Sequence, residues 1–244
     1  MRNPLRAFLT LMLSSFVLPA VAQSPPANTV RTPLAAGRLT SVVEMPLYFR
    51  LYRARLPAAG RSSYSAVNTM LYGLSGALTI DIGGTAQSLA EGKGVFIPAG
   101  QEATISASGS GSADFLVFVL TAGPNQRKPL LDRPAAVSEL YRTPEPLPGL
   151  QPGPYEFSLI RVSLPAHMAA NPPHYRSGAA LYYVLSGTGA FTADGKTEPR
   201  PAGTSHFEHS GWVHQWANPG DGPLVLLQAN ISQEGIPAIL PAQR

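Results

Sequence analysis

The sequence predicts an all-β protein built from two copies of one strand-rich unit. Proline (25 residues) and glycine (23 residues) interrupt the chain at short intervals. Between them lie short runs rich in valine, leucine, isoleucine, tyrosine and phenylalanine, which is the pattern of strands. These runs are LYFRLYRARL, MLYGLSGALTIDI, GVFIPAG, DFLVFVL, FSLIRVSL, ALYYVLSGTGAFT and PLVLLQANI. No long stretch repeats its apolar residues at helical spacing, and the one short candidate helix spans residues 135–141.

The runs recur along the chain at a nearly constant distance. LYFRLYRARLP (47–57) resembles EFSLIRVSLP (156–165), with equivalent residues 108 positions apart. LYGLSG and YYVLSG follow at a distance of 111 positions, and Gly92 and Gly203 keep the same distance. A constant offset across separate strands indicates an internal duplication.

The duplication divides the chain into two units joined by a linker. The first unit spans residues 36–123 and the second spans residues 151–234. Residues 124–150 contain seven prolines or glycines and little periodicity, which is typical of a connecting segment that packs over one unit.

The first residues predict export. Met1 is followed by Arg2 and Arg6, an apolar run (7–18) and the small-residue sequence Ala-Val-Ala that ends at Ala22. This is the pattern of a signal peptide of residues 1–22, cleaved before Gln23, and the run is too short to serve as a membrane anchor. We therefore expect an exported protein, periplasmic or secreted. The chain has no cysteine, so it has neither disulfides nor a lipid-anchoring cysteine, and its stability depends on a hydrophobic core.

The charges argue against nucleic-acid binding. The chain has 18 Lys and Arg against 14 Asp and Glu, and two of the arginines fall in the predicted signal peptide. The basic residues are scattered, whereas a nucleic-acid surface needs a cluster of them. A small-molecule ligand is the expected partner.

The candidate site lies in the second unit. The stretch GTSHFEHSGWVHQWAN (203–218) contains three of the five histidines of the chain. Residues two apart in a strand point to the same face, so His214 shares a face with Trp216, and His174 shares one with Arg176. By the same alternation, Ala180 and Tyr182 share a face. The predicted interior set is therefore His174, Arg176, Ala180, Tyr182, His214 and Trp216.

These residues resemble the two signature motifs of the cupin family. The second cupin motif, G-x5-P-x-G-x2-H-x3-N, corresponds to Gly203, Gly211, His214 and Asn218, with His209 in place of the proline. The first motif, G-x5-H-x-H-x3,4-E-x6-G, corresponds to His174 and Gly187 in HYRSGAALYYVLSG. Arg176 replaces its second histidine and Ala180 replaces its glutamate.

The resemblance implies a bicupin, two tandem jelly-roll β-barrels, which pair through their outer sheets into a homodimer. It also implies one divalent metal (iron, manganese, zinc, nickel or copper) held at the histidine and glutamate positions. In the first unit, counting back 111 positions gives Ser63, Ser65, Thr69 and Ala103, none of them an effective metal ligand. The first unit is therefore expected to be structural, with binding of a small polar ligand left open.

Three interpretations of the second unit remain open. A metal-dependent oxygenase, isomerase or decarboxylase would use His174 and His214, with a third ligand from His209, Glu208, His206 or the substrate. Arg176 opposes this interpretation, because a guanidinium cannot donate a lone pair and repels a dication. A metal-free site would use Arg176, His174 and His214 to hold a small carboxylate, with Tyr182 and Trp216 packing on its body.

The third interpretation is a scaffold or interaction module without a ligand, and the sequence leaves open whether the protein is an enzyme. Two histidines are expected outside the site. His206 is expected on the solvated face of its strand, and His167 in an exposed loop.

Overall fold

The structure is a computed structural model that describes residues 28–40, 46–65, 67–123 and 131–242. The predicted signal peptide, residues 1–22, lies outside these residues. The described residues form nineteen strands and no helix, which confirms the all-β prediction. Within the described ranges we find no helix of the length and hydropathy needed to cross a membrane.

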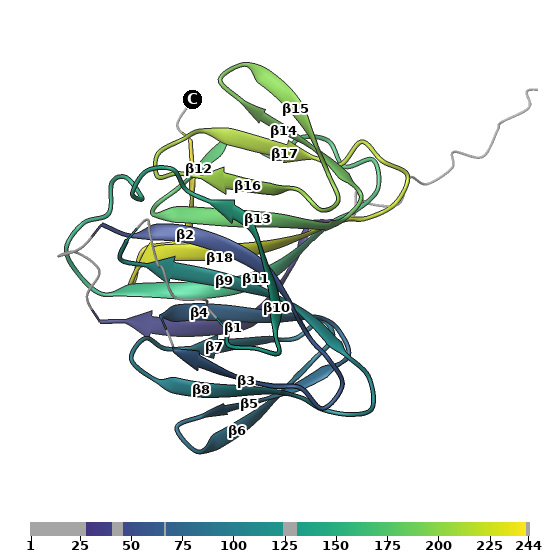
Figure 1. Ribbon diagram of the computed structural model, residues 1–244. Coiled ribbons are helices and arrows are strands. Elements are labelled where there is room, and N and C mark those ends of the chain that lie inside the picture. The colour runs from purple at the N-terminus through teal and green to yellow at the C-terminus, as the bar shows by residue number, and fades with distance from the viewer. Residues whose placement is uncertain (1–27, 41–45, 66, 124–130, 243–244) are drawn as a thin grey trace, which may run out of the picture.

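The strands form four sheets, stacked as layers (Figure 1). One inner sheet has the spatial order β1-β11-β18-β13-β16. Its strands are β1 (Val30–Leu39), β11 (Tyr155–Leu164), β18 (Leu224–Gln233), β13 (Ala179–Ser186) and β16 (Ser205–Glu208).

The other inner sheet has the order β10-β2-β9-β4-β7 and repeats the same arrangement. Its strands are β10 (Ala136–Arg142), β2 (Tyr48–Leu56), β9 (Ala113–Thr121), β4 (Asn68–Ser75) and β7 (Gly94–Ile97).

Each inner sheet is covered by an outer sheet, and the pair encloses one barrel (Figure 1). The outer sheet of the C-terminal barrel consists of β15 (Lys196–Pro201), β14 (Thr188–Ala193), β17 (His214–Ala217), β12 (His174–Arg176) and β19 (Ile239–Pro241). The outer sheet of the N-terminal barrel consists of β3 (Arg61–Ser65), β8 (Glu102–Ala107), β5 (Ala77–Ile82) and β6 (Thr85–Ala90).

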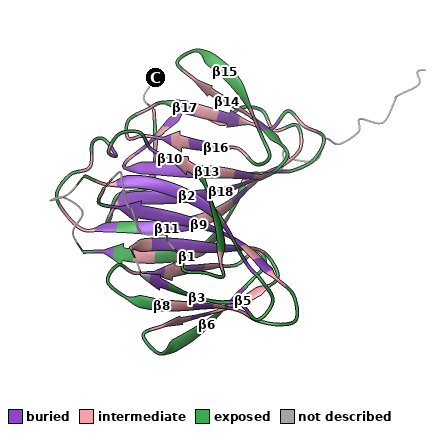
Figure 2. Ribbon diagram, in the orientation of Figure 1, coloured by how far each residue is buried: buried purple, intermediate pink, exposed green. Residues whose placement is uncertain are grey.

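The two inner sheets pack face to face, and this contact is the largest apolar core. Phe49 and Leu51 of the N-terminal barrel meet Phe157 and Leu159 of the C-terminal barrel in one continuous cluster. Figure 2 shows buried residues concentrated in these central sheets and exposed residues in the outer hairpins. Because strands alternate, the opposite faces of the same sheets line the two barrel interiors. Each interior has its own apolar cluster.

Two strands join a barrel from outside the sequence unit that forms the rest of it. β1 begins at Val30, ahead of the first unit (36–123), yet it pairs antiparallel with β11 of the C-terminal barrel. β10 lies in the segment expected to be a linker (124–150), and it pairs with β2 of the N-terminal barrel. Each strand thus completes the inner sheet of a barrel and brings its side chains to that barrel.

The prediction of a short helix at residues 135–141 is wrong, because residues 136–142 form strand β10. A segment this short carries too few apolar residues to distinguish the two periods. The free edge of β2 supplies the hydrogen-bond partners that decide the outcome, and this edge is a tertiary feature.

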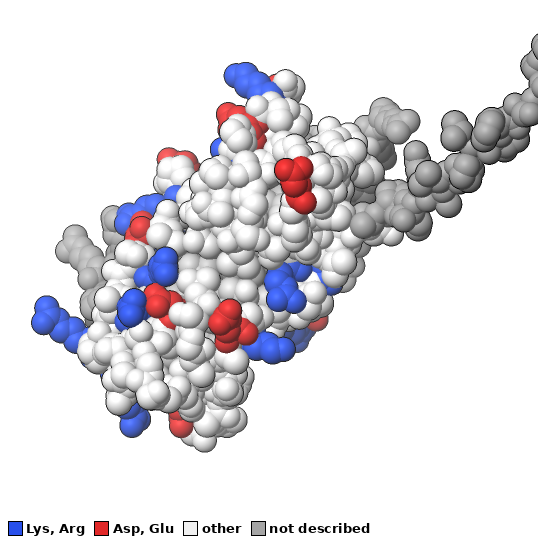
Figure 3. All heavy atoms as spheres, turned by 90° about the vertical axis from the view of Figure 1, so that its right-hand side faces the viewer, with Lys and Arg blue, Asp and Glu red and all other residues white. Residues whose placement is uncertain are grey.

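Charged side chains are dispersed over the surface. On the face shown in Figure 3, Lys and Arg side chains alternate with Asp and Glu side chains rather than forming a single-sign patch. The charges that bear on function are instead those inside the barrels.

Candidate functional site

The strands of the C-terminal barrel bring the predicted interior residues together. β12 and β17 pair at His174 and His214, so the two imidazoles lie side by side with ring centroids 4.4 Å apart. The six residues expected to face the interior are all buried: His174, Arg176, Ala180, Tyr182, His214 and Trp216.

Glu208 is the centre of this site. It lies on β16 opposite Ala180, the position that replaces the glutamate of the cupin motif, and its side chain is fully buried. Its Oε2 accepts a hydrogen bond from Arg176 Nε at 2.6 Å, and its Oε1 accepts one from Trp216 Nε1 at 2.8 Å. His214 Nε2 lies 3.0 Å from Oε2, in ion-pair range. A carboxylate from the neighbouring strand therefore occupies the space left by Ala180.

Arg176 points into the barrel and is 1% exposed. Besides its bond to Glu208, it donates through Nη2 to the hydroxyl of Tyr182, which in turn donates to Gln228 Oε1 at 3.0 Å. Its Nη1 is buried without a hydrogen-bond partner among the described residues. The interior thus holds an ordered polar network with one spare donor.

The two site imidazoles have the same tautomer. Nδ1 of His174 lies 3.0 Å from the carbonyl of Pro172, and Nδ1 of His214 lies 2.7 Å from the carbonyl of Trp212. Because a carbonyl oxygen only accepts, both Nδ1 atoms carry the proton, and both Nε2 atoms keep a lone pair when the rings are neutral. The rings are fixed by backbone contacts. Nε2 of His174 is available for a ligand, whereas Nε2 of His214 faces the Glu208 carboxylate.

Burial and charge shift the pKa values in opposite directions. Burial alone would raise the pKa of Glu208, but the Arg176 guanidinium and the contacts with His214 and Trp216 hold it well below its usual range. Burial lowers the pKa of His174 to about 4. At neutral pH the site therefore holds a carboxylate, a guanidinium and a neutral His174.

The remaining histidines differ in their surroundings. His206 was expected on the solvated face, and this is wrong: it is 8% exposed, and its ring lies 3.9 Å from that of Phe191. It shares the inner face of β16 with Glu208, two residues away. His209 is half-buried, stacks on Trp212 at 5.2 Å and bonds to the Ser210 carbonyl, so it does not join the network around Glu208. His167 is exposed, as expected.

A narrow pocket of about 10 Å³, the space of about one water, opens toward this network. Its lining combines the side chains of His174, Tyr182 and Trp216 with those of Thr29 and Arg31 from the start of β1. Arg31 remains solvent-exposed along part of its length and donates through Nη1 to Gln228 Oε1 at 2.9 Å. One exposed side chain therefore lies over the mouth of the barrel.

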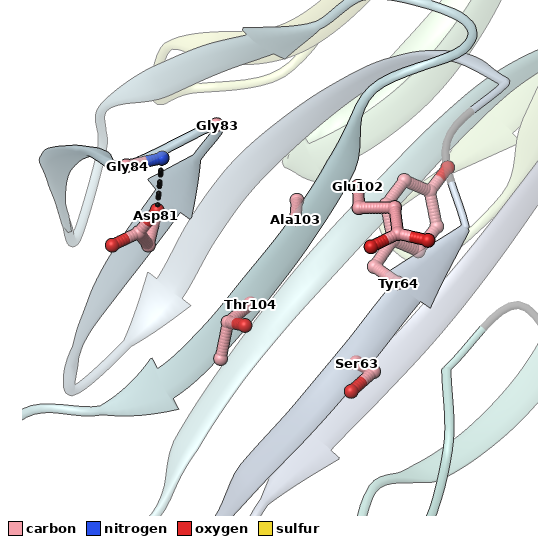
Figure 4. Close-up of a pocket in the computed structure, with 8 residues that line it drawn as sticks. All are labelled: Ser63, Tyr64, Asp81, Gly83, Gly84, Glu102, Ala103 and Thr104. Carbon is pink, nitrogen blue, oxygen red and sulfur yellow. Dashed lines mark hydrogen bonds between the residues drawn. The ribbon is translucent and has the colours of Figure 1, made fainter.

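The described residues of the N-terminal barrel form no comparable network around a buried carboxylate. The register places Tyr64, rather than Ser63, opposite Ala103, so Tyr64 takes the position that corresponds to His174. Tyr64 is buried and hydrogen-bonded to Thr69. Ser63 lies one residue out of register and lines a hollow of about 390 Å³ (Figure 4).

That hollow also includes Thr104, which pairs with Ser63, and Asp81, which pairs with Thr104. Residues paired directly across a sheet lie on one face, here the face opposite to Tyr64 and Ala103. Asp81 Oδ1 accepts a hydrogen bond from the amide of Gly84 (Figure 4). These three polar residues therefore place the hollow mainly on the outer face of the sheet, and Tyr64 and Ala103 also border it.

The residues of the C-terminal barrel do not fit a divalent metal as they are arranged. Among the described residues, no group of three or more His, Cys, Asp or Glu side chains is placed to hold a metal ion. His174 and His214 supply two nitrogen donors, but the third donor, Glu208, is already bound to a guanidinium at 2.6 Å. Catalytic metal sites generally use three protein ligands.

The fold and the interior site define a protein of two tandem jelly-roll barrels, with a polar site inside the second. Residues 160–229 match the Cupin_2 family, described as a cupin domain. The second barrel is thus a cupin domain, as the sequence motifs suggested, and the first barrel repeats the strand order of its inner sheet.

Solved structures support the same fold. Oxalate decarboxylase from Bacillus subtilis is 15% identical with a TM-score of 0.53, and the match covers 88% of this chain and 76% of that chain. AerE from Microcystis aeruginosa is 12% identical with a TM-score of 0.53, covering 82% of this chain and 99% of that chain. Identities this low establish the fold alone. The search of curated proteins found no match.

Sequence reasoning missed several residues of the site. Gln228 and Asn230 alternate with apolar residues in LLQANI, and this pattern could have placed both on the inner face of their strand. No such sequence pattern points to Arg31, because the residues around it do not show that β1 pairs with a strand of the second barrel.

The buried histidines make stability depend on pH. Burial lowers the pKa values of His174 and His206 from 6.5 to about 4, so below pH 6.5 the unfolded chain binds protons that the folded chain does not. We expect the free energy of unfolding to fall as the pH drops from about 6.5 to about 4. The loss from Glu208 should follow at lower pH, because its pKa is depressed. Urea midpoints measured across this range test the expectation.

Matched variants assign the effect to these rings. His174→Gln and His206→Gln should each flatten the pH dependence, whereas His167→Asn, at an exposed position, should leave it unchanged. An equal slope in all four proteins would contradict the assignment to buried histidines.

Proposed function

We propose that the C-terminal barrel binds a small organic carboxylate that also carries a hydroxyl group, without a metal. The observation that carries the proposal is the pocket shared by Arg31, His174, Tyr182 and Trp216. It combines a cation, a fixed hydrogen-bond acceptor and an aromatic wall, which is the usual composition of a small-molecule site.

The charges around the pocket favour an anion. Arg176 is compensated by Glu208 at 2.6 Å, whereas Arg31 has no ion-pair partner among the described residues and bonds only to the neutral Gln228. Arg31 is therefore the cation that faces the ligand, and Arg176 organises the floor of the site. This changes the role that the sequence suggested for Arg176.

His174 sets the second requirement for the ligand. Its Nδ1 donates to the Pro172 carbonyl and its depressed pKa keeps the ring neutral, so Nε2 accepts a hydrogen bond. A ligand hydroxyl supplies the matching donor, while its carboxylate replaces Gln228 as the partner of Arg31. The apolar body packs on Trp216 and Leu226, and displacement of the exposed Arg31 side chain enlarges the pocket to admit it.

Thermal unfolding with a panel of small aliphatic and aromatic hydroxy acids, each beside its deoxy counterpart, tests this proposal. A hydroxy acid at a hundred times its dissociation constant should add about 2.7 kcal/mol of stability. Arg31→Ala should remove the effect, and Arg38→Ala, on the same strand but paired with Glu234 outside the pocket, should retain it.

His174→Phe should lower the affinity of the protein for the hydroxy acid toward its affinity for the deoxy counterpart. An effect that survives in Arg31→Ala would place the binding elsewhere. Absence of stabilisation by every acid of the panel would reject carboxylate binding in this barrel.

Metal-dependent catalysis is the second candidate, and one observation favours it. Both site imidazoles donate through Nδ1 to backbone carbonyls, an orientation that metal-binding histidines commonly share. Metal binding at this site would require the ion pair between Arg176 and Glu208 to break. Metal content measured by mass spectrometry on protein purified without chelator decides between the candidates. We expect well below one metal per chain, and a value near one that is lost in His214→Ala would favour the metalloenzyme.

The proposed function includes export to the periplasm or the exterior after cleavage before Gln23, and pairing of two chains as a homodimer. Mass spectrometry of protein secreted from a bacterial host tests the cleavage site, and light scattering tests the oligomeric state.

A further inference from the structure

A second charged group lies inside the N-terminal barrel. Arg50 of β2 is 3% exposed. Its Nη1 donates to the hydroxyl of Tyr52 at 3.0 Å, and its Nη2 is buried without a hydrogen-bond partner in the part of the chain that the structure describes. No carboxylate of the described residues forms an ion pair with it, in contrast to Arg176 in the other barrel.

The alternation of β2 places Arg50 on the barrel side of the sheet. Phe49 and Leu51 pack into the core between the two barrels, so Arg50 and Tyr52 face the other way, where Tyr52 joins the apolar cluster of the N-terminal barrel. Arg50 is therefore part of an interior in which the motif positions offered no metal ligands.

A second guanidinium lies near Arg50 but has its own counter-ion. Arg142 of β10 lies directly across from Arg50, so both side chains emerge on the same face of the sheet. Glu139 compensates Arg142 through a contact of 2.5 Å, and Arg50 is left as the uncompensated charge. Like charges at directly opposed positions destabilise a sheet unless an anion lies near them.

The burial of the Arg50 guanidinium is energetically unfavourable unless a counter-ion lies beside it. A charge removed from water loses its solvation, and a partner of opposite sign is needed to compensate for that loss. The free Nη2 is one donor, and the Tyr52 hydroxyl, which accepts from Nη1, keeps its own proton to donate. Two donors beside one cation match the oxygens of a carboxylate or phosphate.

We infer that the N-terminal barrel binds a small oxyanion at Arg50 and Tyr52, a second site distinct from the pocket beneath Arg31. The equivalent position in the C-terminal barrel is Ser158, because Arg50 pairs with Val119 as Ser158 pairs with Asn230, the residue 111 positions later. The duplication therefore does not predict this site, and the two barrels hold different anion-binding groups. The inference stands independently of the function proposed for the C-terminal barrel.

Thermal unfolding of the mature chain in a buffer free of oxyanions, titrated with inorganic phosphate or with acetate, tests the inference. Saturating anion should raise the melting temperature by about 5–10 °C, the range expected at a hundred times the dissociation constant for a chain of this size. Arg50→Met should abolish the rise. Arg53→Met should preserve it, because Arg53 lies on the same strand but is exposed and paired with Asp114. Arg31→Ala should also preserve it, which separates this site from the proposed carboxylate pocket.

The unliganded variant gives an independent readout. In the oxyanion-free buffer, Arg50→Met should melt at the same temperature as the unchanged protein or above it, because a buried cation without a partner has been removed. A melting temperature several degrees lower would mean that the chain itself supplies a counter-ion, and would overturn the inference. So would a phosphate and acetate response equal in Arg50→Met and the unchanged protein. A larger rise with phosphate than with acetate would identify the phosphate class as the preferred ligand, and the reverse would identify carboxylates.

Discussion

Arg176→Ala should lose about 3–5 kcal/mol of unfolding free energy and acquire metal binding. The loss is expected because Glu208 is fully buried, and its charge would lack the guanidinium that now lies 2.6 Å away. The gain is expected because His174, His214 and Glu208 would then be three donors without a competing cation. Urea unfolding with and without zinc measures both effects: zinc should restore stability to the variant and leave the unchanged protein unaffected.

Two further variants separate these causes. Arg176→Ala combined with Glu208→Gln should lose the response to zinc, because the carboxylate ligand is gone. Arg176→Met combined with Glu208→Leu should be more stable than Arg176→Ala alone, since no uncompensated charge stays buried, and the remaining loss is that of the acceptor of Trp216 Nε1. A response to zinc of equal size in the unchanged protein would show that Arg176 does not exclude a metal.

Phe157→Ala should lower the free energy of unfolding by about 3–5 kcal/mol and still give a single transition. The side chain is fully buried, with ring centroids 6.1 Å from Phe49 and 6.3 Å from Phe96, both of the N-terminal barrel. Removal of the ring leaves a cavity in the core shared by the two barrels, and such cavities cost energy beyond the lost transfer term.

The positions of the tryptophans allow a direct test of whether the two barrels unfold together. Both tryptophans, Trp212 and Trp216, belong to the C-terminal barrel, so their fluorescence follows that barrel, whereas far-ultraviolet circular dichroism follows both. Coincident urea transitions by the two probes indicate one cooperative unit. Phe157→Leu, which keeps most of the apolar volume, should show a smaller loss. Separate transitions, with only one shifted by Phe157→Ala, would contradict the shared core.

Local pattern determined much of the site in advance. Period-two alternation placed His174 with Arg176 and His214 with Trp216 on shared faces, and the motif spacing located those faces in the second barrel. The sequence left Glu208 among several possible third groups, because alternation within one strand does not show which residue of another strand lies opposite. The pairing of Glu208 with Ala180 decided it.

The misassigned residues have a common physical origin. His206 was expected in solvent, yet it shares the inner face of β16 with Glu208 and packs on Phe191, so its environment depends on the sheet across the barrel. Ser63 was expected at a motif position from a constant offset, but the register shifts by one residue and places Tyr64 there. One-residue shifts exchange the two faces of a strand, and a count along the chain cannot detect them.

The sequence by itself determined the all-β class, the duplication, the cupin resemblance and the position of the site in the second barrel. These features depend on patterns within single strands and on spacing along the chain, which a sequence records directly. Only the tertiary structure decided that Arg176 pairs with Glu208, that β1 carries Arg31 to the second barrel, and that Arg50 is buried in the first. Each of these facts depends on which strand edges meet and in what register. Hydrogen bonding between distant segments sets that register, and no local preference encodes it.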